Sequence, residues 1–363
     1  MEKTALSLSE TGRLPEPGAA STGRPRMVDV AEVAGVSLKT VSRVINEEPG
    51  VVDATRERVR AAIAQLGYRV NGPARALASH RSGAIGIITE ATAHFGPTTQ
   101  FLGLERAVWA AGYSVVVASL KTRTAPEFSL AVDRLLDTGV DGLLINGSNS
   151  RPVSLAQALP ADVPTVSVGD PPTGNVPADA NLLYAYNDQA AGAGQAVRHL
   201  LDLGHRAVHH LAGPLDWVPA QLRLAAWQRT LRTAGVPEPA PEYGDWSAQS
   251  GYEAGRRLLA RPDVTAVFAA NDQMAIGLLR AAAEAHRSVP ATLSVIGFDD
   301  IPEASYLPVP LTTVRQEFKQ LAVAAVGQLV SQIAGQETTR LISVPTTLRL
   351  RDSTAQPPSQ EKK

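Results

Sequence analysis

The stretch VDVAEVAGVSLKTVSRVIN, residues Val28–Asn46, decides the architecture of the N-terminal part of the chain. Its apolar residues recur at helical spacing on both sides of Gly35, which predicts two short helices joined by a tight turn. Ser37 is a suitable N-cap for the second helix, expected over Leu38 to Asn46. Two helices around such a turn have helix-turn-helix geometry, which places the second helix in the major groove of DNA.

The side chains of these two helices divide between an inner and an outer face. Ala31 and Ala34 are small enough for a close approach of the helices, and a small core is expected from Val36, Val41 and Val44. The outer face of the second helix then presents the residues that would meet base edges and phosphates: Leu38, Lys39, Ser42 and Arg43. On spacing alone, an ordinary helical hairpin is the alternative.

A third helix is predicted from Ala54 to Leu66, with Asp53 at its N-cap and Gly67 after its end. Residues 24–81 carry ten Lys or Arg and six Asp or Glu, a balance of +4, whereas the rest of the chain has a balance of −5. A basic N-terminal piece on an acidic body is typical of a nucleic-acid-binding head attached to a separate globular domain.

The segment that follows, Tyr68 to Arg81, has two possible interpretations. Pro73 suits the first turn of a helix, and this helix would be short enough to be marginal in isolation. Leu77 then stands exposed among small and basic residues, where it could wedge into a minor groove and kink a base step. A flexible linker with an incidental leucine explains the same residues, and both interpretations stay open.

From Ala84 onward, short apolar β-rich runs alternate with helical stretches such as Asn187–Leu203 and Asp272–Ala285. This alternation predicts parallel sheets covered by helices on both faces. With 363 residues, at roughly 100–200 residues per domain, two doubly wound α/β lobes fit better than one. The predicted strands are Ala84–Thr89, Tyr113–Ser119, Gly142–Asn146, Pro164–Val168, Ala207–Ala212, Ala266–Ala270 and Leu293–Phe298.

Polar residues follow several of these strands. Asn271 and Asp299 come directly after two predicted strands, at the strand ends where open α/β sheets bind ligands. Asp, Asn and Arg side chains exchange hydrogen bonds with sugar hydroxyls, and Arg223 adds the arginine to this set. Trp246 can lie on the apolar side of a pyranose ring. The alternative makes Trp246 a core residue and Asp272 and Asp300 helix N-caps, and for Asp272 the cap is favoured.

Several classes of protein are excluded. The chain has no cysteine, which excludes disulfides, thiol catalysis and thiolate metal sites, and it has neither an HExxH nor a GxSxG motif. No run approaches the ~20 apolar residues that span a bilayer, and the first residues lack a signal-peptide apolar region, so we expect a cytoplasmic protein. We expect no cofactor, no metal and no catalytic residue. The N-terminal leader and the C-terminal tail are predicted to be disordered.

With these motifs in order, the chain resembles the LacI/GalR family of bacterial transcription regulators over residues 27–352. The resemblance implies a helix-turn-helix headpiece, a hinge helix and a two-lobed core of the periplasmic-binding-protein type. It also implies a homodimer on double-stranded operator DNA, with a small-molecule effector, expected to be a sugar, between the lobes. The stretches that carry it are Val28–Asn46, Leu211–Trp227, Gly244–Tyr252, Ala270–Gly277, Val295–Asp300 and Pro310–Phe318.

The resemblance assigns domains and roles. It gives a leader over residues 1–24, a headpiece over 25–70, a hinge over 71–83, a core over 84–352 and a tail over 353–363. The positions that match the family's DNA contacts are Leu38, Lys39 and Arg43 in the headpiece, and Asn71, Ala74 and Leu77 in the hinge. The positions that match its effector contacts are Pro97, Arg223, Trp246, Asn271, Asp299, Gln316 and Phe318.

The chain departs from the family pattern at three positions. Gly169 stands where a close relative carries an effector-binding Asp, with Asp170 one step later, and Glu90 replaces a small hydroxyl residue. Both bear on the identity of the effector. Leu38 replaces a Tyr in the recognition helix, which bears on the operator sequence. The tail has no leucine heptads, which favours a dimer over a dimer of dimers.

Other functions are weighed against this one. A transport protein with the same core would carry a signal peptide and no headpiece, and an enzyme would need a base or nucleophile in the cleft. The sequence therefore predicts a sequence-specific repressor of carbohydrate-utilisation genes that a sugar releases from its operator. The alternative is a regulator of the same fold with a non-sugar effector, such as a purine, acting as a corepressor.

Overall fold

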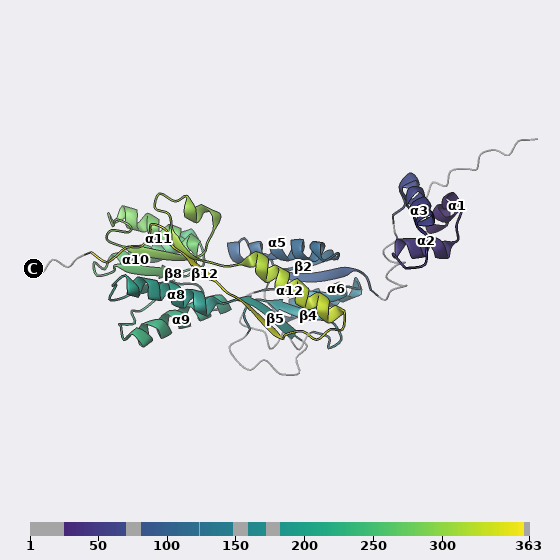
Figure 1. Ribbon diagram of the computed structural model, residues 1–363. Helices are drawn as coiled ribbons and strands as arrows, with labels where there is room; N and C mark the ends of the chain where they lie inside the picture. Colours follow the sequence, from purple (N-terminus) through teal and green to yellow (C-terminus); the bar gives the residue numbers. More distant parts are fainter. Residues whose placement is uncertain (1–24, 70–80, 123, 148–158, 172–181, 359–363) are drawn as a thin grey trace, which may run out of the picture. The chain divides into compact units, whose positions relative to one another are not determined.

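The computed structural model describes residues 25–69, 81–122, 124–147, 159–171 and 182–358. The chain divides into two compact units, Met1–Ser79 and His80–Lys363 (Figure 1).

The described residues of the first unit form three helices: α1 (Met27–Ala34), α2 (Leu38–Ile45) and α3 (Asp53–Leu66). The Ser37 side chain accepts a hydrogen bond from the Thr40 N–H at 3.2 Å and so caps α2 as expected. Asp53 is not the cap of α3, because the cap position belongs to Val52 and Asp53 is already helical. The core of this unit is formed by buried residues from all three helices and Tyr68, namely Val30, Ala31, Ala34, Val41, Val44, Val59, Ala62 and Tyr68.

The described residues of the second unit form two sheets of six strands (Figure 1). The N-lobe sheet has the order β11 (Leu341–Val344), β5 (Leu182–Asn187), β4 (Thr165–Val168), β3 (Gly142–Asn146), β1 (Ala84–Glu90) and β2 (Ser114–Leu120). The C-lobe sheet has the order β12 (Thr347–Arg349), β10 (Thr312–Arg315), β9 (Ser294–Asp299), β8 (Ala266–Ala269), β6 (His209–Ala212) and β7 (Glu242–Tyr243). All pairs are parallel except β10 with β12.

Helices cover both faces of each sheet, as the strand–helix alternation predicts. In the N-lobe, α5 (Phe95–Ala110) and α12 (Phe318–Ile333) pack on one face and α6 (Ala125–Asp137) on the other. In the C-lobe, α8 (Gln189–Asp202) and α9 (Val218–Ala234) oppose α10 (Ala248–Leu259) and α11 (Asp272–Glu284), and a 3-10 turn, Pro302–Ser305, follows β9. Most apolar side chains of the strands are therefore buried under helices, whereas Val117 on β2 and Leu341 on β11 are exposed.

The chain passes between the lobes three times: from β5 to α8, from β10 to α12 and from β11 to β12. At the first passage, the predicted start of the helix at Asn187 is wrong. Asn187 is the last residue of β5 and not the start of the helix, which begins at Gln189 behind the N-cap Asp188. The pattern missed β5 because its apolar run leads into the helix with only Asp188 between them.

The predicted disorder of the C-terminal tail is wrong for its first residues. Ser353 is fully buried, and its hydroxyl accepts from the Thr312 N–H and donates to the Val295 carbonyl at 2.8 and 2.6 Å. Its carbonyl accepts from the Val295 N–H, and the Ala355 carbonyl accepts from the Ser294 hydroxyl at 3.0 Å. The backbone polar groups of β9 and β10 thus find partners in the tail, which a composition rich in small polar residues does not reveal.

We therefore expect the tail to contribute to stability. A chain that ends at Asp352 should unfold about 2 kcal/mol more easily than the full chain, because buried backbone groups lose their partners. A chain that ends at Pro358 keeps those contacts and is the matched control. Urea denaturation measures both, and equal stabilities would show that the docked tail is energetically irrelevant.

Candidate functional site

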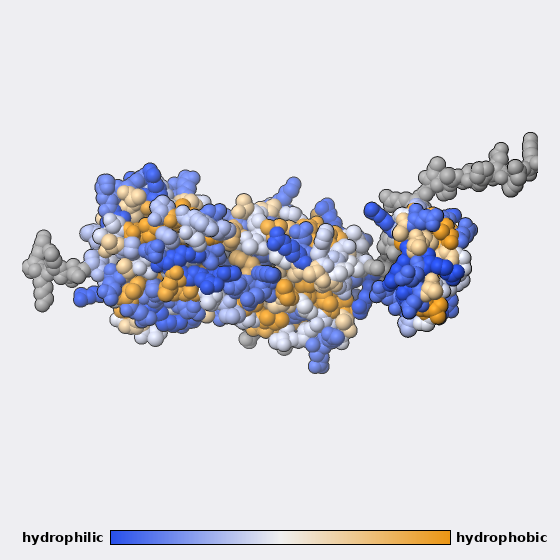
Figure 2. Space-filling model, turned by 45° about the horizontal axis from the view of Figure 1, so that its top comes forward, coloured by the Kyte–Doolittle hydropathy of each residue, from blue (hydrophilic) through white to orange (hydrophobic). Residues whose placement is uncertain are grey.

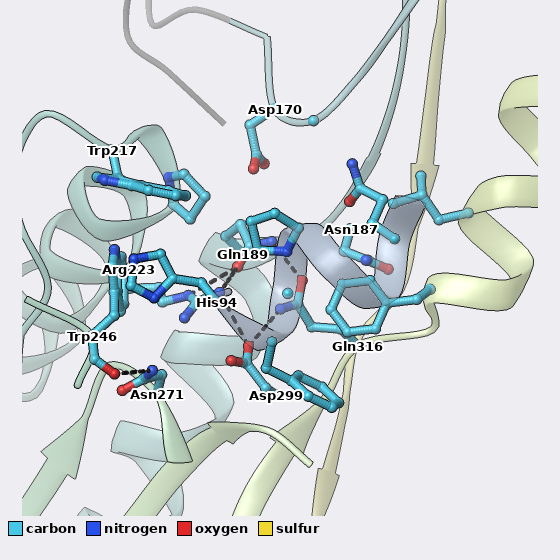
Figure 3. Close-up of a pocket in the computed structure, with 18 residues that line it drawn as sticks. His94, Asp170, Asn187, Gln189, Trp217, Arg223, Trp246, Asn271, Asp299 and Gln316 are labelled. Carbon is cyan, nitrogen blue, oxygen red and sulfur yellow. Dashed lines mark hydrogen bonds and ion pairs between the residues drawn. The ribbon is translucent and has the colours of Figure 1, made fainter. Parts of the chain in front are cut away.

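A pocket with about 600 Å³ of empty space, partly open to solvent, lies between the two lobes. Residues from both sheets line it, many of them at the carboxyl ends of strands, where doubly wound sheets bind ligands (Figure 3). The structure brings together all of the residues predicted to contact an effector: Pro97, Arg223, Trp246, Asn271, Asp299, Gln316 and Phe318.

Four buried side chains in this pocket form a closed ring of polar contacts. The Arg223 Nε donates to Gln189 Oε1 at 2.9 Å, and Gln189 Nε2 donates to Gln316 Oε1 at 2.8 Å. Gln316 Nε2 donates to Asp299 Oδ1 at 2.7 Å, and the same oxygen lies 3.6 Å from Arg223 Nη2. Arg223 also donates to the Ala270 carbonyl. The ring fixes the orientation of each member before any ligand arrives.

Burial disfavours the charged forms of the two ionisable members of the ring, Arg223 and Asp299. Arg223 lies over the Phe298 ring, with its guanidinium carbon 3.7 Å from the ring centroid. Burial raises the pKa of Asp299 to about 6, against the opposing effect of Arg223, and raises the pKa of Asp170 to about 7 for the same reason. The pocket thus contains two carboxyl groups for one guanidinium, an arrangement that hydrogen-bond donors on a ligand would stabilise.

Trp246 and Asp299 have strained backbones. Their φ angles are 76° and 114°, a region that non-glycine residues rarely adopt. The Asn271 amide holds Trp246 by donating to its carbonyl at 3.0 Å, while the Asn271 Oδ1 accepts from the Met274 N–H. A Cβ on Gly213 would lie 2.3 Å from the Trp246 ring, so the close approach requires glycine here. Asn271 therefore acts as the cap of α11 and as a support for Trp246.

The favoured cap at Asp272 is wrong, and so is the alternative that made Asp300 a cap. Asp272 is the first residue of α11 rather than its N-cap; its buried carboxylate accepts from the Ile301 N–H at 2.9 Å and the Thr313 hydroxyl at 2.5 Å. Asp300 is also not a cap and pairs with Arg351 at 2.6 Å. Both aspartates hold the turn that carries Asp299. Trp246 agrees with both interpretations, because its side chain is buried and also lines the pocket.

Sequence reasoning missed several pocket residues. His94, Asn187, Gln189 and Trp217 also line the pocket, with Asp170. The position of Asn187 at a strand end would have revealed it had β5 been recognised. The Trp217 ring lies edge-on to both His94 and Trp246, at centroid distances of 5.6 and 6.0 Å. Aromatic rings therefore form much of one wall.

Two departures from the family pattern, at Gly169 and Glu90, bear on the effector, and only Gly169 lines the pocket. Gly169 has a φ of 153°, and a Cβ there would lie 2.6 Å from the Gly147 carbonyl oxygen, so no side chain fits without a shift. The carboxylate at this edge of the pocket comes instead from Asp170, which points into it (Figure 3). Glu90 is not among the residues that line the pocket.

The helical unit presents the second candidate surface. Leu38 is 49% exposed, Lys39 is exposed, and Ser42 and Arg43 are half-buried on α2. Arg43 Nε lies 3.7 Å from Glu48 Oε2. On the face shown in Figure 2, hydrophilic residues cover much of this unit. Asn71, Ala74 and Leu77 lie outside the described residues.

Within the described ranges, no cluster of His, Asp and Glu is arranged to hold a metal ion. No helix among the described residues is both long and apolar enough to cross a bilayer.

A helix-turn-helix unit followed by a two-lobed α/β unit with a pocket between the lobes defines a ligand-responsive DNA-binding regulator. Residues 26–71 match the bacterial regulatory proteins of the lacI family, and residues 197–354 match the periplasmic binding protein-like domain. The chain is 37% identical to the lactose operon repressor of Escherichia coli (strain K12), over 92% of each chain. The chain belongs to the lacI family.

Two further comparisons agree. The chain is 36% identical to the transcriptional regulator CelR of Thermobifida fusca, over 87% of this chain and 94% of the relative. A crystal structure of the lac repressor dimer bound to operator and the anti-inducer ONPF aligns with a TM-score of 0.81 at 35% identity, covering 92% of this chain and all of that one. A CelR–cellobiose complex aligns with a TM-score of 0.66 at 34% identity, covering 91% of this chain and all of that one.

The raised pKa of Asp170 predicts a pH-dependent cost of folding. An unfolded aspartate has a pKa near 3.9, so the folded chain holds its proton more tightly, and this contribution to stability is lost as the pH rises towards about 7. Asp170→Asn removes the ionisation. Its melting temperature relative to the parent should be higher at pH 8 than at pH 5, and a difference that is the same at both pH values would contradict the burial of this carboxylate.

Proposed function

We propose that this protein is a cytoplasmic, homodimeric repressor of carbohydrate-utilisation genes that a sugar releases from its operator. The observation that carries the proposal is the pocket, in which the Arg223–Asp299 pair faces aromatic walls formed by Trp217 and Trp246. Carboxylate and guanidinium groups bind vicinal hydroxyls through directed hydrogen bonds, and aromatic faces accept the apolar side of a pyranose. The complexes of the lac repressor and CelR support the same class of ligand.

The DNA-binding part of the proposal places residues 25–70 as the headpiece and residues 71–83 as the hinge. Leu38, Lys39, Ser42 and Arg43 on α2 read the major groove, and the hinge residues Asn71, Ala74 and Leu77 contact the minor groove. The positive balance of this region attracts the phosphate backbone, so binding falls steeply with salt. A homodimer reads the two halves of a pseudo-palindromic operator.

The release step follows from linkage. A sugar that contacts Asp299 and Gln316 touches both the C-lobe and a passage between the lobes, so it favours one arrangement of the lobes over another. The N-lobe begins at the hinge, and a change in lobe arrangement separates the two hinges of the dimer. Sugar and operator then oppose each other through one equilibrium, and each weakens the binding of the other by the same factor. A purine that strengthens operator binding instead would establish corepression.

We expect Lys39→Ala and Arg43→Ala each to weaken operator binding by roughly 1–3 kcal/mol if the side chain reads a base. Binding to non-specific DNA should change less, because only the operator presents the base that the side chain reads, whereas the loss of a phosphate contact weakens binding to every sequence alike. Footprinting at several salt concentrations measures both. If both variants protect the operator as tightly as the parent, α2 is not the recognition helix.

Asp299→Asn keeps the shape of the side chain and removes its charge beside Arg223. Sugar binding should weaken by roughly 2–5 kcal/mol, while operator binding is unchanged, which gives a repressor that no longer responds. Arg232→Ala removes an exposed ion pair on α9 and is the control. Calorimetry with a panel of mono- and disaccharides is the test. The proposed function fails if the parent binds no sugar in that panel.

A further inference from the structure

Two buried polar atoms of the pocket, Asn187 Oδ1 and Trp246 Nε1, have no hydrogen-bond partner among the residues that the structure describes. Asn187 is 2% exposed and Trp246 is 7% exposed. A buried polar atom without a partner costs about 1–3 kcal/mol, and native proteins keep few of them. Since both residues line the pocket, a bound ligand is the natural source of the missing partners. Trp246 belongs to the wall already described, whereas Asn187 lies on the other lobe.

Asn187 has a neighbour of similar chemistry. It ends β5, and Asp170 follows the end of β4, the adjacent strand, with Val168 paired to Ala185. The Gly169 N–H donates to the Ala185 carbonyl at 2.9 Å, which keeps the two strand ends together. Figure 3 shows Asp170 and Asn187 on the side of the pocket away from Asn271 and Asp299. The pocket therefore has a polar set on each side.

The two polar sets differ in how far they are already paired. On the C-lobe side, Arg223, Gln189, Gln316 and Asp299 bond to one another. None of the bonds of that ring reaches Asp170 or Asn187. Aromatic side chains also line the pocket, with Phe95 edge-on to Phe318 at 6.1 Å and His94 edge-on to Trp217 at 5.6 Å between ring centroids. A ligand that fills the pocket meets polar groups from both lobes and the aromatic rings of its lining.

We propose that Asp170 and Asn187 form a second polar subsite, which accepts hydrogen bonds from hydroxyl groups on the end of the effector away from Asp299. The effector is accordingly a disaccharide whose second pyranose lies at this subsite, and not a glycoside with an apolar aglycone. This inference rests on the proposed function. It assigns to Asp170 and Asn187 the selection of the group that is linked to the first sugar.

The chemistry of the subsite explains the selection. A carboxylate and an amide oxygen are acceptors, so they are satisfied by hydroxyl donors and left unpaired by an alkyl group. A site built to bond a hydroxyl rejects an analogue that lacks it more strongly than an apolar pocket rejects an extra hydroxyl. Burial raises the pKa of Asp170, which agrees with a carboxyl group whose charge the hydroxyl donors of a ligand would stabilise.

The experiment is calorimetry on the full chain with lactose, cellobiose and maltose, each compared with the methyl and isopropyl glycosides of its non-reducing sugar. We expect one disaccharide to bind at least about tenfold more tightly than its simple glycosides. Asn187→Leu has a similar size and no polar atoms, and should weaken that disaccharide about tenfold or more while changing methyl glycoside binding less than about twofold. Asp170→Asn should weaken the disaccharide in the same selective way.

Thermal unfolding without sugar separates this role from a structural one. Because Asn187 Oδ1 has no partner within the described part of the chain, Asn187→Leu should not lower the melting temperature. A lowered melting temperature together with equal losses for disaccharide and methyl glycoside would assign Asn187 to the fold and overturn the inference. So would an isopropyl glycoside that binds as tightly as the disaccharide, or variants that bind the disaccharide like the parent. In each case the parent still binds sugar, and the proposed function stands; if the parent binds none, both fail.

Discussion

A guanidinium that is taken out of water must be neutralised where it lies, and the middle of this protein is organised around that requirement at Arg223. Its side-chain partners, Gln189 at the start of α8 and Asp299 at the end of β9, are both bonded to Gln316, which follows β10. Two of these segments are passages between the lobes. Neutralising one charge therefore also fixes where the chain leaves one lobe and enters the other.

The third passage, from β11 to β12, is joined to the first, from β5 to α8, by two hydrogen bonds. Thr346 donates its hydroxyl hydrogen to the Asp188 carbonyl at 3.0 Å, and the Asp188 N–H donates to the Val344 carbonyl at 2.9 Å. All three connections are thus cross-linked beside the pocket, by the ring on one side and by these bonds on the other. In the proposed function, a ligand in the pocket would act on the connections between the lobes, where hinged domains convert binding into motion.

The sequence predicted the fold class and the strand-end residues Asn271 and Asp299, because both depend on local periodicity and on motifs. It placed Asn271, Asp299 and Arg223 at the pocket without coordinates. It misplaced Asp272, whose carboxylate bonds Ile301 and Thr313 far along the chain. Whether an aspartate at a helix start caps that helix or reaches across the structure depends on tertiary packing, which no window of sequence contains.

The same limit applies to the residues that were missed. Asn187 was assigned to a helix because its strand leads into that helix across a single residue, and the tail beyond Asp352 was assigned to disorder because its residues are small and polar. In both places the deciding partners, β4 for one and β9 with β10 for the other, lie more than ten residues away. Composition indicates what a segment would do in isolation, whereas the structure of these two segments depends on contacts with distant parts of the chain.

The docked tail and the interleaved lobes also constrain how the protein is made. The N-lobe sheet is completed by β11 and covered by α12, and the C-lobe sheet is completed by β12 and by Ser353. Neither lobe has all its strands until nearly the whole chain has left the ribosome, whereas the helices of residues 27–66 can pack at once. Long-range pairing of this kind folds slowly and leaves strand edges open meanwhile. During synthesis, the headpiece is therefore complete well before the part that regulates it.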